Sequence, residues 1–198
     1  MLFIMQFLLI MLLQFAKAVG ATVIAITSTE EKAEKLKDLG ADHVINYTAH
    51  PEWGQIAKEL TGKGEGIDLV LDVVGGKTFS QSLNSIKLGG VVTMIGVLDG
   101  FNPAEWPSTV EILGHMCTVR AIAVGSKAHF EEMLSFINAH SIKPIIDHQV
   151  FEFEELKAAY EYLVCSRSPL ISPLSYRREW SSDIVCLSYT FVSLDIDN

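Results

Sequence analysis

The sequence predicts an α/β fold built on a doubly wound, mostly parallel sheet. The clearest sign is residues 21–47, where an apolar run, a polar turn, an amphipathic helix pattern, a glycine and a second apolar run follow one another. Apolar runs and helix patterns continue to alternate as far as residue 124. One of these runs, residues 67–74, is almost continuously apolar, as expected of a strand buried on both faces.

Elements in the first third of the chain follow from this pattern. The run LQFAKAVG at residues 13–20 indicates the end of a first helix, which leads directly into a strand at residues 22–26. The next helix carries apolar residues at helical spacing until Gly40 stops it. A third helix begins near Pro51, because proline fits the first turn of a helix, and one of its faces is apolar as far as Leu60.

The rest of the chain continues the alternation and then loses it. We expect a strand at residues 67–74, a helix at 77–88, a strand at 91–95, a loop at 96–107, a short helix capped by Ser108, a last strand at 117–124 and a helix at 127–140. A short extended segment at 150–153 and a helix at 154–163 follow. Residues 165–198 are expected to be loosely ordered, with one strand at 185–192.

Composition and charge restrict the function. An apolar fraction of 49% over 198 residues indicates one globular domain with a sizeable core. The net charge of −9 argues against a nucleic-acid partner, because phosphate binding needs clustered Lys and Arg. The Cys and His residues show no spacing typical of zinc ligands, so we expect no metal site and reduced thiols in a cytoplasmic protein.

The N-terminal residues 1–13 are almost continuously apolar and leave two interpretations open. They are fewer than the roughly 20 residues that a membrane-spanning helix needs, and they run without a break into the first helix. We therefore favour a buried or partly exposed helix. The alternative is a targeting or membrane-associated segment, because Ala16, Lys17 and Ala18 resemble the site at which a signal peptide is cleaved.

The turn after the strand at residues 22–26 indicates which nucleotide the fold would bind. A site that prefers NAD has a carboxylate here, which accepts hydrogen bonds from the 2′-hydroxyl of the ribose. This sequence instead has Thr27, Ser28 and Thr29, with Lys32 one helical turn further on. Hydroxyls and helix amides donate to phosphate oxygens and an ammonium balances their charge, so the turn suits the 2′-phosphate of NADP(H). The alternative is that Ser28 only caps the helix and Lys32 is solvated.

Five runs of sequence carry a resemblance to a known family. They are LQFAKAVGATVIAIT, EKLKDLGADHVINY, GIDLVLDVVGG, LGGVVTMIGVLDG and FEELKAAYEYL, in that order along the chain. Together they resemble the Rossmann-like coenzyme half of the medium-chain dehydrogenases/reductases, closest to the zinc-type alcohol dehydrogenase-like and NADPH quinone reductase-like branches. The resemblance implies a nucleotide-binding domain with a return segment at residues 19–164, between an apolar segment at 1–18 and a divergent tail at 165–198.

The resemblance also implies roles for two groups of residues. In the family, a Ser, a Lys and a Tyr surround the adenosine 2′-phosphate, and the matching positions here are Ser28, Lys32 and Tyr47. Backbone atoms after the later strands line the nicotinamide, and the matching positions are Val74, Ile95, Gly96 and Val97. The alternative for Gly96 and Gly100 is that they only permit the turn. The implied reaction is hydride transfer between NADPH and a small carbonyl, enone or quinone substrate, in a homodimer that pairs the edge strand at 117–124 with its mate.

The departures from the family pattern matter as much as the matches. The family places a glycine-rich turn and a central first strand before the first helix, but residues 1–12 contain no glycine, so we expect both to be missing. The family's N-terminal domain, which carries the substrate pocket, is missing as well, and the catalytic residues stay unknown. We therefore expect a truncated member that is weakly active or inactive alone. The alternatives are a noncatalytic nucleotide-binding or dimerisation module and a chain that does not fold stably.

A missing central strand would leave the hydrogen-bonding groups of its two neighbours unpaired. Each buried, unsatisfied backbone group costs roughly 1 to 3 kcal/mol, so several of them would rival the stability of a whole domain. The sequence leaves two ways to close the gap: the neighbouring strands pair directly, or residues 1–9 fill it.

Two carboxylates on the strand at 67–74 raise a different possibility. Asp68 and Asp72 are four residues apart and point to the same face of a strand, so a catalytic carboxylate pair is conceivable. We favour a different interpretation, in which Asp68 lies at the start of the strand and Asp72 lies near the ligand end.

Overall fold

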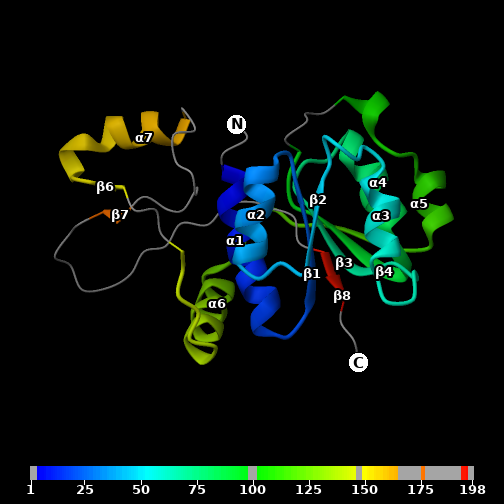
Figure 1. Cartoon of the computed structure of the whole chain (residues 1–198), viewed down its shortest axis with the longest axis horizontal. Coiled ribbons are helices and arrows are strands. Elements are labelled where there is room, and N and C mark those ends of the chain that lie inside the picture. The colour runs from blue at the N-terminus through cyan, green and yellow to red at the C-terminus, as the bar shows by residue number, and fades with distance from the viewer. Residues whose placement is uncertain (1–3, 98–101, 146–148, 165–174, 177–192, 196–198) are drawn as a thin grey trace.

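A six-stranded sheet forms the centre of the molecule (Figure 1). The computed structural model describes residues 4–97, 102–145, 149–164, 175–176 and 193–195. The strands are β1 (Thr22–Thr27), β2 (His43–Asn46), β3 (Ile67–Asp72), β4 (Ile86–Met94), β5 (Thr118–Ala121) and β8 (Ser193–Asp195). They lie in the order β2-β1-β8-β3-β4-β5. Neighbouring strands are parallel except at β8, which is antiparallel to both β1 and β3.

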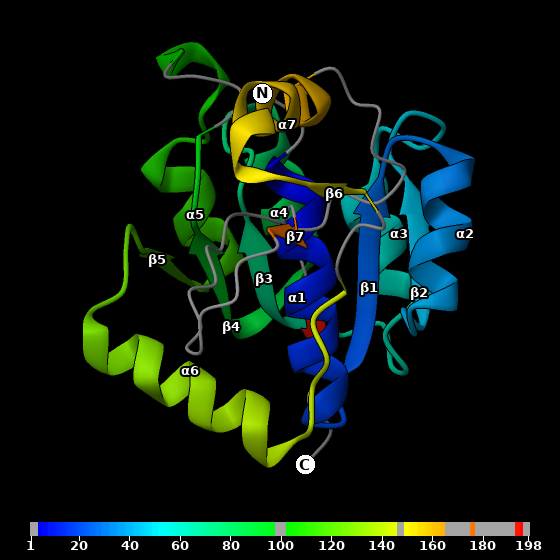
Figure 2. The ribbon, with the colours of Figure 1, turned by 90° about the vertical axis from the view of Figure 1, so that its left-hand side faces the viewer.

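Helices cover both faces of this sheet, which confirms the predicted α/β, doubly wound fold. On one face lie α1 (Ile4–Ala18), α2 (Glu30–Asp38) and α6 (Lys127–Ala139) (Figure 1). On the other face lie α3 (Trp53–Glu59), α4 (Lys77–Ser85) and α5 (Thr109–His115). Figure 2 views the molecule from the side of α1 and α6. The other described elements are η1 (Pro103–Glu105), β6 (Val150–Phe151), η2 (Phe153–Glu155), α7 (Leu156–Val164) and β7 (Ser175–Tyr176).

The sheet separates two apolar cores, and β1 contributes to both. Val23 and Ala25 point to the core beneath α1 and α2, whereas Ile24 points to the core beneath α3 and α4. All three side chains are buried. Because successive strand residues face opposite sides, a strand covered on both faces must be apolar at every position. Each fully buried aliphatic side chain contributes about 1.5 to 3 kcal/mol relative to its exposed state.

Residues 21–47 form the β-α-β unit that the sequence predicts. Strands β1 and β2 are parallel and pair Thr27 with Asn46, and α2 connects them. Gly40 has a φ of 100°, a left-handed conformation that glycine adopts at no steric cost. The N–H of Ala41 then donates to the carbonyl of Leu36 at 3.0 Å, which closes the helix end.

Several predicted boundaries differ from the structure, and three of them differ for a clear local reason. The strand predicted to reach residue 74 ends at Asp72, because the N–H groups of Val74 and Gly75 donate to the Asp72 side chain instead of to a neighbouring strand. Ile86, predicted to be helical, begins β4, where it pairs with Ile67 and is buried. Strand β5 is shorter than the predicted 117–124, because its partner β4 ends at Met94.

The position between β1 and β3 is filled in a way that the sequence did not predict. Neither of the two expected closures occurs: β1 and β3 do not pair with each other, and residues from Ile4 onward belong to α1. Strand β8 lies there instead and pairs its Leu194 with Val23 on one side and Leu69 on the other. Its residues come from the tail that was expected to be loosely ordered. The strand predicted at 185–192 lies outside the described residues.

Helix α1 packs onto the sheet as the favoured interpretation of the N-terminal run expects. Met11 and Leu13 are buried almost completely, at 1% and 0% exposure. At the end of the helix, Lys17 forms an ion pair of 2.7 Å with Asp42, whose carboxylate also accepts from the N–H of Val23 at 2.7 Å. Within the described part of the chain, no helix has the length and apolar character needed to cross a membrane.

Candidate functional site

The carboxyl ends of four parallel strands meet along one edge of the sheet. The register pairs Thr27 with Asn46 at the ends of β1 and β2, and Asp72 with Met94 at the ends of β3 and β4. Open α/β sheets bind their ligands in the crevice at this edge. The residues that the sequence proposes for the nucleotide all follow these strand ends, so the fold gathers them into two groups, one after β1 and β2 and one after β3 and β4.

The first group follows β1 and β2. Ser28 and Tyr47 come directly after the paired residues Thr27 and Asn46, and the N–H of Tyr47 donates to the carbonyl of Thr27 at 2.9 Å. The hydroxyl of Thr48 donates to the carbonyl of Ser28 at 3.1 Å and ties the two turns together. The structure therefore brings Ser28 and Tyr47 to neighbouring turns of the same edge.

The cap of helix α2 decides one of the alternatives for Ser28. The N-cap residue is Thr29, whose hydroxyl oxygen accepts from the N–H of Lys32 at 3.4 Å. Ser28 is therefore not the capping residue, and its half-buried side chain lies just before the helix. Its role in binding a nucleotide stays a prediction.

Lys32 lies in the first turn of α2 and its side chain is partly buried. The carboxylate of Glu31 in the same turn forms an ion pair of 2.6 Å with Lys35. The hydrogen bond and the charge of Lys35, with a smaller contribution from the charge of Lys32, lower the pKa of Glu31. Lys35 is thus the main partner of this carboxylate, and the charge of Lys32 acts on it more weakly, from the same first turn of α2.

The second group follows β3 and β4 and is packed much more tightly. Gly75 and Gly76 have φ values of 68° and 54°, which permit a sharp turn from β3 into α4. The N–H of Ile95 donates to the backbone carbonyl of Asp72 at 2.7 Å, which joins this turn to the end of β4. Val74, Ile95, Gly96 and Val97 are all partly buried, so the structure brings these predicted residues together.

Gly96 is required by the close approach of these two turns. A Cβ atom on Gly96 would lie 2.5 Å from the carbonyl oxygen of Val73. A Cβ on Gly75 would lie 2.8 Å from the ring of Trp106, which also packs against Phe79 with ring centroids 5.9 Å apart. The glycine at 96 therefore serves packing between turns, which goes beyond the alternative that it only permits a turn. Gly100 lies outside the described residues.

Asp72 is the residue of this site whose importance sequence reasoning missed. Its side chain is completely buried, and its carboxylate accepts from the N–H of Val74 at 3.0 Å, the N–H of Gly75 at 2.8 Å and the hydroxyl of Ser82 at 2.7 Å. Burial raises the pKa of Asp72 to about 6, although the hydrogen bonds from Gly75, Ser82 and Val74 oppose the shift. A signal was present in the sequence: one acidic residue near the end of an apolar run, three residues before the first of two consecutive glycines.

The possible pair of catalytic carboxylates does not form. Asp68 lies near the start of β3 and forms an ion pair with Lys87, whereas Asp72 is the last residue of the strand and is buried. The predicted positions of both residues along the strand are confirmed, while binding of a ligand at the end with Asp72 stays a prediction. In the described ranges, no group of three or more His, Cys, Asp or Glu side chains could hold a metal ion.

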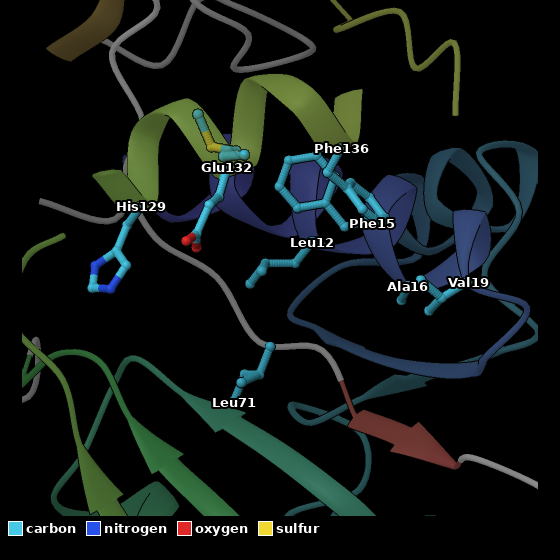
Figure 3. A pocket seen from close by; sticks show the side chains of 9 residues that line it. Leu12, Phe15, Ala16, Val19, Leu71, His129, Glu132 and Phe136 are labelled. Carbon is cyan, nitrogen blue, oxygen red and sulfur yellow. The ribbon is translucent and has the colours of Figure 1, made fainter. Parts of the chain in front are cut away.

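A separate groove of about 520 Å³ lies between α1, α6 and the sheet (Figure 3). Leu12 and Phe15 of α1, Phe136 of α6 and Leu71 of β3 line it, and the rings of Phe15 and Phe136 meet edge to face at 5.6 Å. None of the residues proposed for the nucleotide lines this groove. It is therefore distinct from the edge at which the two groups lie.

Comparison with known proteins identifies relatives over most of the chain. Residues 10–139 match the profile of a family described as zinc-binding dehydrogenase. A zinc-type alcohol dehydrogenase-like protein of Schizosaccharomyces pombe is 41% identical over 76% of this chain and 43% of its own length. A 2-haloacrylate reductase of Burkholderia is 31% identical over 75% of this chain and 46% of its own length. The chain thus spans less than half the length of these relatives.

Solved structures share the fold. An NAD-dependent alcohol dehydrogenase superposes with a TM-score of 0.67 and 28% identity, over 80% of this chain and 45% of that protein. A mycobacterial protein complexed with NADPH superposes with a TM-score of 0.60 and 29% identity, over 80% of this chain and 51% of that protein. The first of these proteins is NAD-dependent and the second is complexed with NADPH, so similarity of fold does not by itself choose between NAD and NADP.

Proposed function

Because the chain belongs to the zinc-binding dehydrogenase family, we propose that it is the nucleotide-binding part of an NADP(H)-dependent oxidoreductase. The observation that carries the choice of NADP(H) is the turn after β1, which offers hydroxyls and Lys32 where an NAD site has a carboxylate. Ser28, Lys32 and Tyr47 hold the 2′-phosphate in this proposal. Val74, Ile95, Gly96 and Val97 lie against the nicotinamide.

The residues present fit such a cofactor at both ends. Hydroxyl and ammonium groups beside the N-terminus of α2 suit a phosphate, because helix amides and a cation both stabilise negative charge. The positions without a Cβ at Gly75 and Gly96 let the β3 and β4 turns and the ring of Trp106 pack close together at this edge. When bound, the nicotinamide supplies hydride to a carbonyl, enone or quinone substrate, and the protein orients it.

Catalysis by this chain alone is proposed to be weak or absent. The chain spans 43% and 46% of the two relatives described above, and the residues that would recognise a substrate remain unknown. We expect the purified chain to bind NADPH without oxidising it when quinone or enone substrates are added. Sustained loss of absorbance at 340 nm would contradict this part of the proposal.

Lys32→Ala tests the choice of coenzyme. Removal of the ammonium should weaken NADPH binding at least tenfold, because a hydrogen bond to a charged group contributes about 1.5 to 3 kcal/mol. Binding of NADH, which lacks the 2′-phosphate, should change less than about twofold, on the same reasoning. Lys37→Ala is the matched control, because Lys37 is an exposed lysine in the last turn of the same helix. Equal affinity of the unaltered chain for NADPH and NADH would refute the assignment.

The alternative function is a noncatalytic dimerisation module, and exposed apolar side chains beside an edge strand favour it. Strand β5 ends the sheet, and edge strands are sites of association unless they are covered. Leu113 and Val124 near this strand are 72% and 94% exposed. We expect a dimer in sedimentation experiments that Leu113→Lys and Val124→Lys convert to a monomer. Val19→Lys, at an exposed apolar position on α1's side of the sheet, should leave it intact.

A cytoplasmic location belongs to the same proposal. Cys117 is a free thiol in the structure, and burial raises its pKa, so it is expected to stay protonated and unreactive. Packed, reduced thiols are typical of cytoplasmic proteins. A fluorescent fusion that follows a secretory or membrane marker in cells would refute this location.

A further inference from the structure

We propose that Asp72 is a positioning residue, whose buried carboxylate fixes the turn at residues 73–76 and so sets the nicotinamide side of the nucleotide site. The inference rests on the proposed function and adds to it a residue that the ligand does not touch. Asp72 has no exposed surface, so any effect on a ligand must pass through the turn that it holds.

The hydrogen bonds of Asp72 join three parts of the site. One carboxylate oxygen accepts from the N–H groups of Val74 at 3.0 Å and Gly75 at 2.8 Å, which fixes the turn. The other accepts from the hydroxyl of Ser82 at 2.7 Å, which fixes the position of α4 relative to the turn. The backbone carbonyl of Asp72 accepts from the N–H of Ile95 at 2.7 Å. A single residue thus sets the relative positions of β3, α4 and the end of β4.

The turn transmits its position to the residues proposed for the nicotinamide. Val73 and Gly96 approach so closely that a Cβ added to Gly96 would lie 2.5 Å from the Val73 carbonyl oxygen. The ring of Trp106 lies over Gly75, 2.8 Å from the position of a Cβ added there, and the carbonyl oxygen of Gly96 lies 3.3 Å from the same position. Because the turn is in contact with Gly96 and Trp106, a displaced turn would displace Gly96 and its neighbours as well.

The chemistry of the carboxylate distinguishes positioning from simple stabilisation. Its three hydrogen-bond partners are two backbone amides and a hydroxyl, all uncharged. A buried carboxylate with uncharged partners is costly, and its raised pKa reflects this cost. Only an ionised carboxylate accepts from all three donors at once, whereas an amide side chain would accept at one end and donate at the other. The buried carboxylate of Asp72 is therefore energetically unfavourable, but it has the hydrogen-bonding geometry that the turn needs.

Amide hydrogen exchange tests the proposal without any ligand. In Asp72→Ala the N–H groups of Val74 and Gly75 lose their acceptor, and we expect their exchange to accelerate at least tenfold. In Asp72→Asn the charge-assisted bonds become neutral, and we expect about two- to fivefold acceleration. Asp68→Asn is the matched control on the same strand, because its ion pair with Lys87 lies at the opposite end. It should leave both amides unchanged.

Two ligands test the link to the nicotinamide. NADPH carries both the 2′-phosphate and the nicotinamide, whereas adenosine 2′,5′-bisphosphate carries the 2′-phosphate alone. We expect Asp72→Asn to weaken NADPH binding about threefold and Asp72→Ala to weaken it at least tenfold. Binding of the bisphosphate should be unchanged in both variants. Titrations followed by nuclear magnetic resonance measure both affinities. Asp72→Asn decides the question if Asp72→Ala does not fold, because Asn keeps the size of the side chain and one accepting oxygen.

The outcomes separate this inference from the proposed function. If neither ligand binds the unaltered chain, the proposed function fails, while the exchange experiment still decides whether Asp72 holds the turn. If Asp72→Asn weakens the binding of both ligands equally, or of neither, the positioning role is overturned, although the proposed nucleotide binding is retained. Unchanged exchange at Val74 and Gly75 in Asp72→Asn also overturns it.

Discussion

The two ends of the candidate site are built in opposite ways. After β1 and β2 the residues are polar and partly or fully exposed, and one cap and a few backbone bonds hold them. After β3 and β4 they are close-packed around a buried carboxylate, with a glycine where no side chain fits. Specificity for a phosphate needs accessible donors, whereas orientation of a reactive ring needs a rigid wall. The difference teaches that, under the proposed function, the two tasks would impose different demands on the same sheet edge.

Gly96→Ala should have the largest effect on this comparison. The added Cβ would lie 2.5 Å from the Val73 carbonyl oxygen, and the atoms nearest to it are all backbone atoms of Val73, which leaves little room for relaxation. We expect the free energy of unfolding to fall by about 3 kcal/mol or more, as for severe overpacking. Urea denaturation measures the change.

Gly114→Ala provides the control for that substitution. Gly114 lies in α5, and a Cβ there would have no atom within 4 Å. The same chemical change should therefore raise the free energy of unfolding by up to about 1 kcal/mol, because alanine favours a helix. Equal effects of the two substitutions would show that the β3–β4 end is no more tightly packed than the surface.

The second prediction concerns pH. Burial raises the pKa of Asp72 from 3.8 to about 6, so between these values the folded state binds a proton that the unfolded state has released. This contribution to stability is fully present below pH 3.8 and is lost as the pH rises through about 6. The unfolding free energy of the unaltered chain minus that of Asp72→Asn should fall by about 2 to 3 kcal/mol between pH 4 and 7.

A parallel series with Asp68→Asn checks that this pH dependence belongs to the buried carboxyl. Asp68 is paired with Lys87, so its removal should not reproduce the same loss over this window. If the difference between the unaltered chain and Asp72→Asn does not vary with pH, Asp72 is more accessible to water than the structure indicates.

The smallest expected effects distinguish the roles of two neighbouring hydroxyl residues, Ser28 and Thr29, at the β1–β2 end. Thr29→Ala removes the N-cap of α2 and should lower the free energy of unfolding by about 1 kcal/mol. Ser28→Ala should lower it by less than about 0.5 kcal/mol, because Ser28 is not the cap. Ser28→Ala should instead weaken NADPH binding, which Thr29→Ala with its intact Ser28 would affect less. Thermal unfolding and nucleotide titration of both variants measure these effects. If Ser28→Ala lowers stability more and Thr29→Ala weakens NADPH binding more, the assignments of cap and nucleotide-binding residue must be exchanged.

The sequence predicted the parts of this molecule that depend on local patterns. The β-α-β unit around Gly40 was correct because periodicity and a helix-stopping glycine both lie within a few residues of the elements they define. Ile86 was misplaced because its apolar side chain suits a helix as well as a strand, and pairing with Ile67 decides between them. The site residues were found through a family resemblance, and their positions at one edge agree with it, while their binding roles stay predictions.

Two features could not be predicted because they depend on contacts across the fold. The role of Asp72 depends on complete burial, which α4 and the β3–β4 turns together produce. The closure of the sheet depends on residues 193–195, whose pattern is too short to indicate a strand. Both are set by tertiary structure, which overrides local preference.

The antiparallel strand β8 also has a consequence for how the chain folds. Residues 193–195 bridge β1 and β3, although nearly the whole chain separates them from β1 in sequence. During synthesis the N-terminal strands leave the ribosome long before the segment that joins them, so their edges stay open to other chains meanwhile. Contacts between such distant segments also slow folding. A chaperone that shields strand edges should therefore raise the yield of the native protein more than it raises the yield of a domain with local topology.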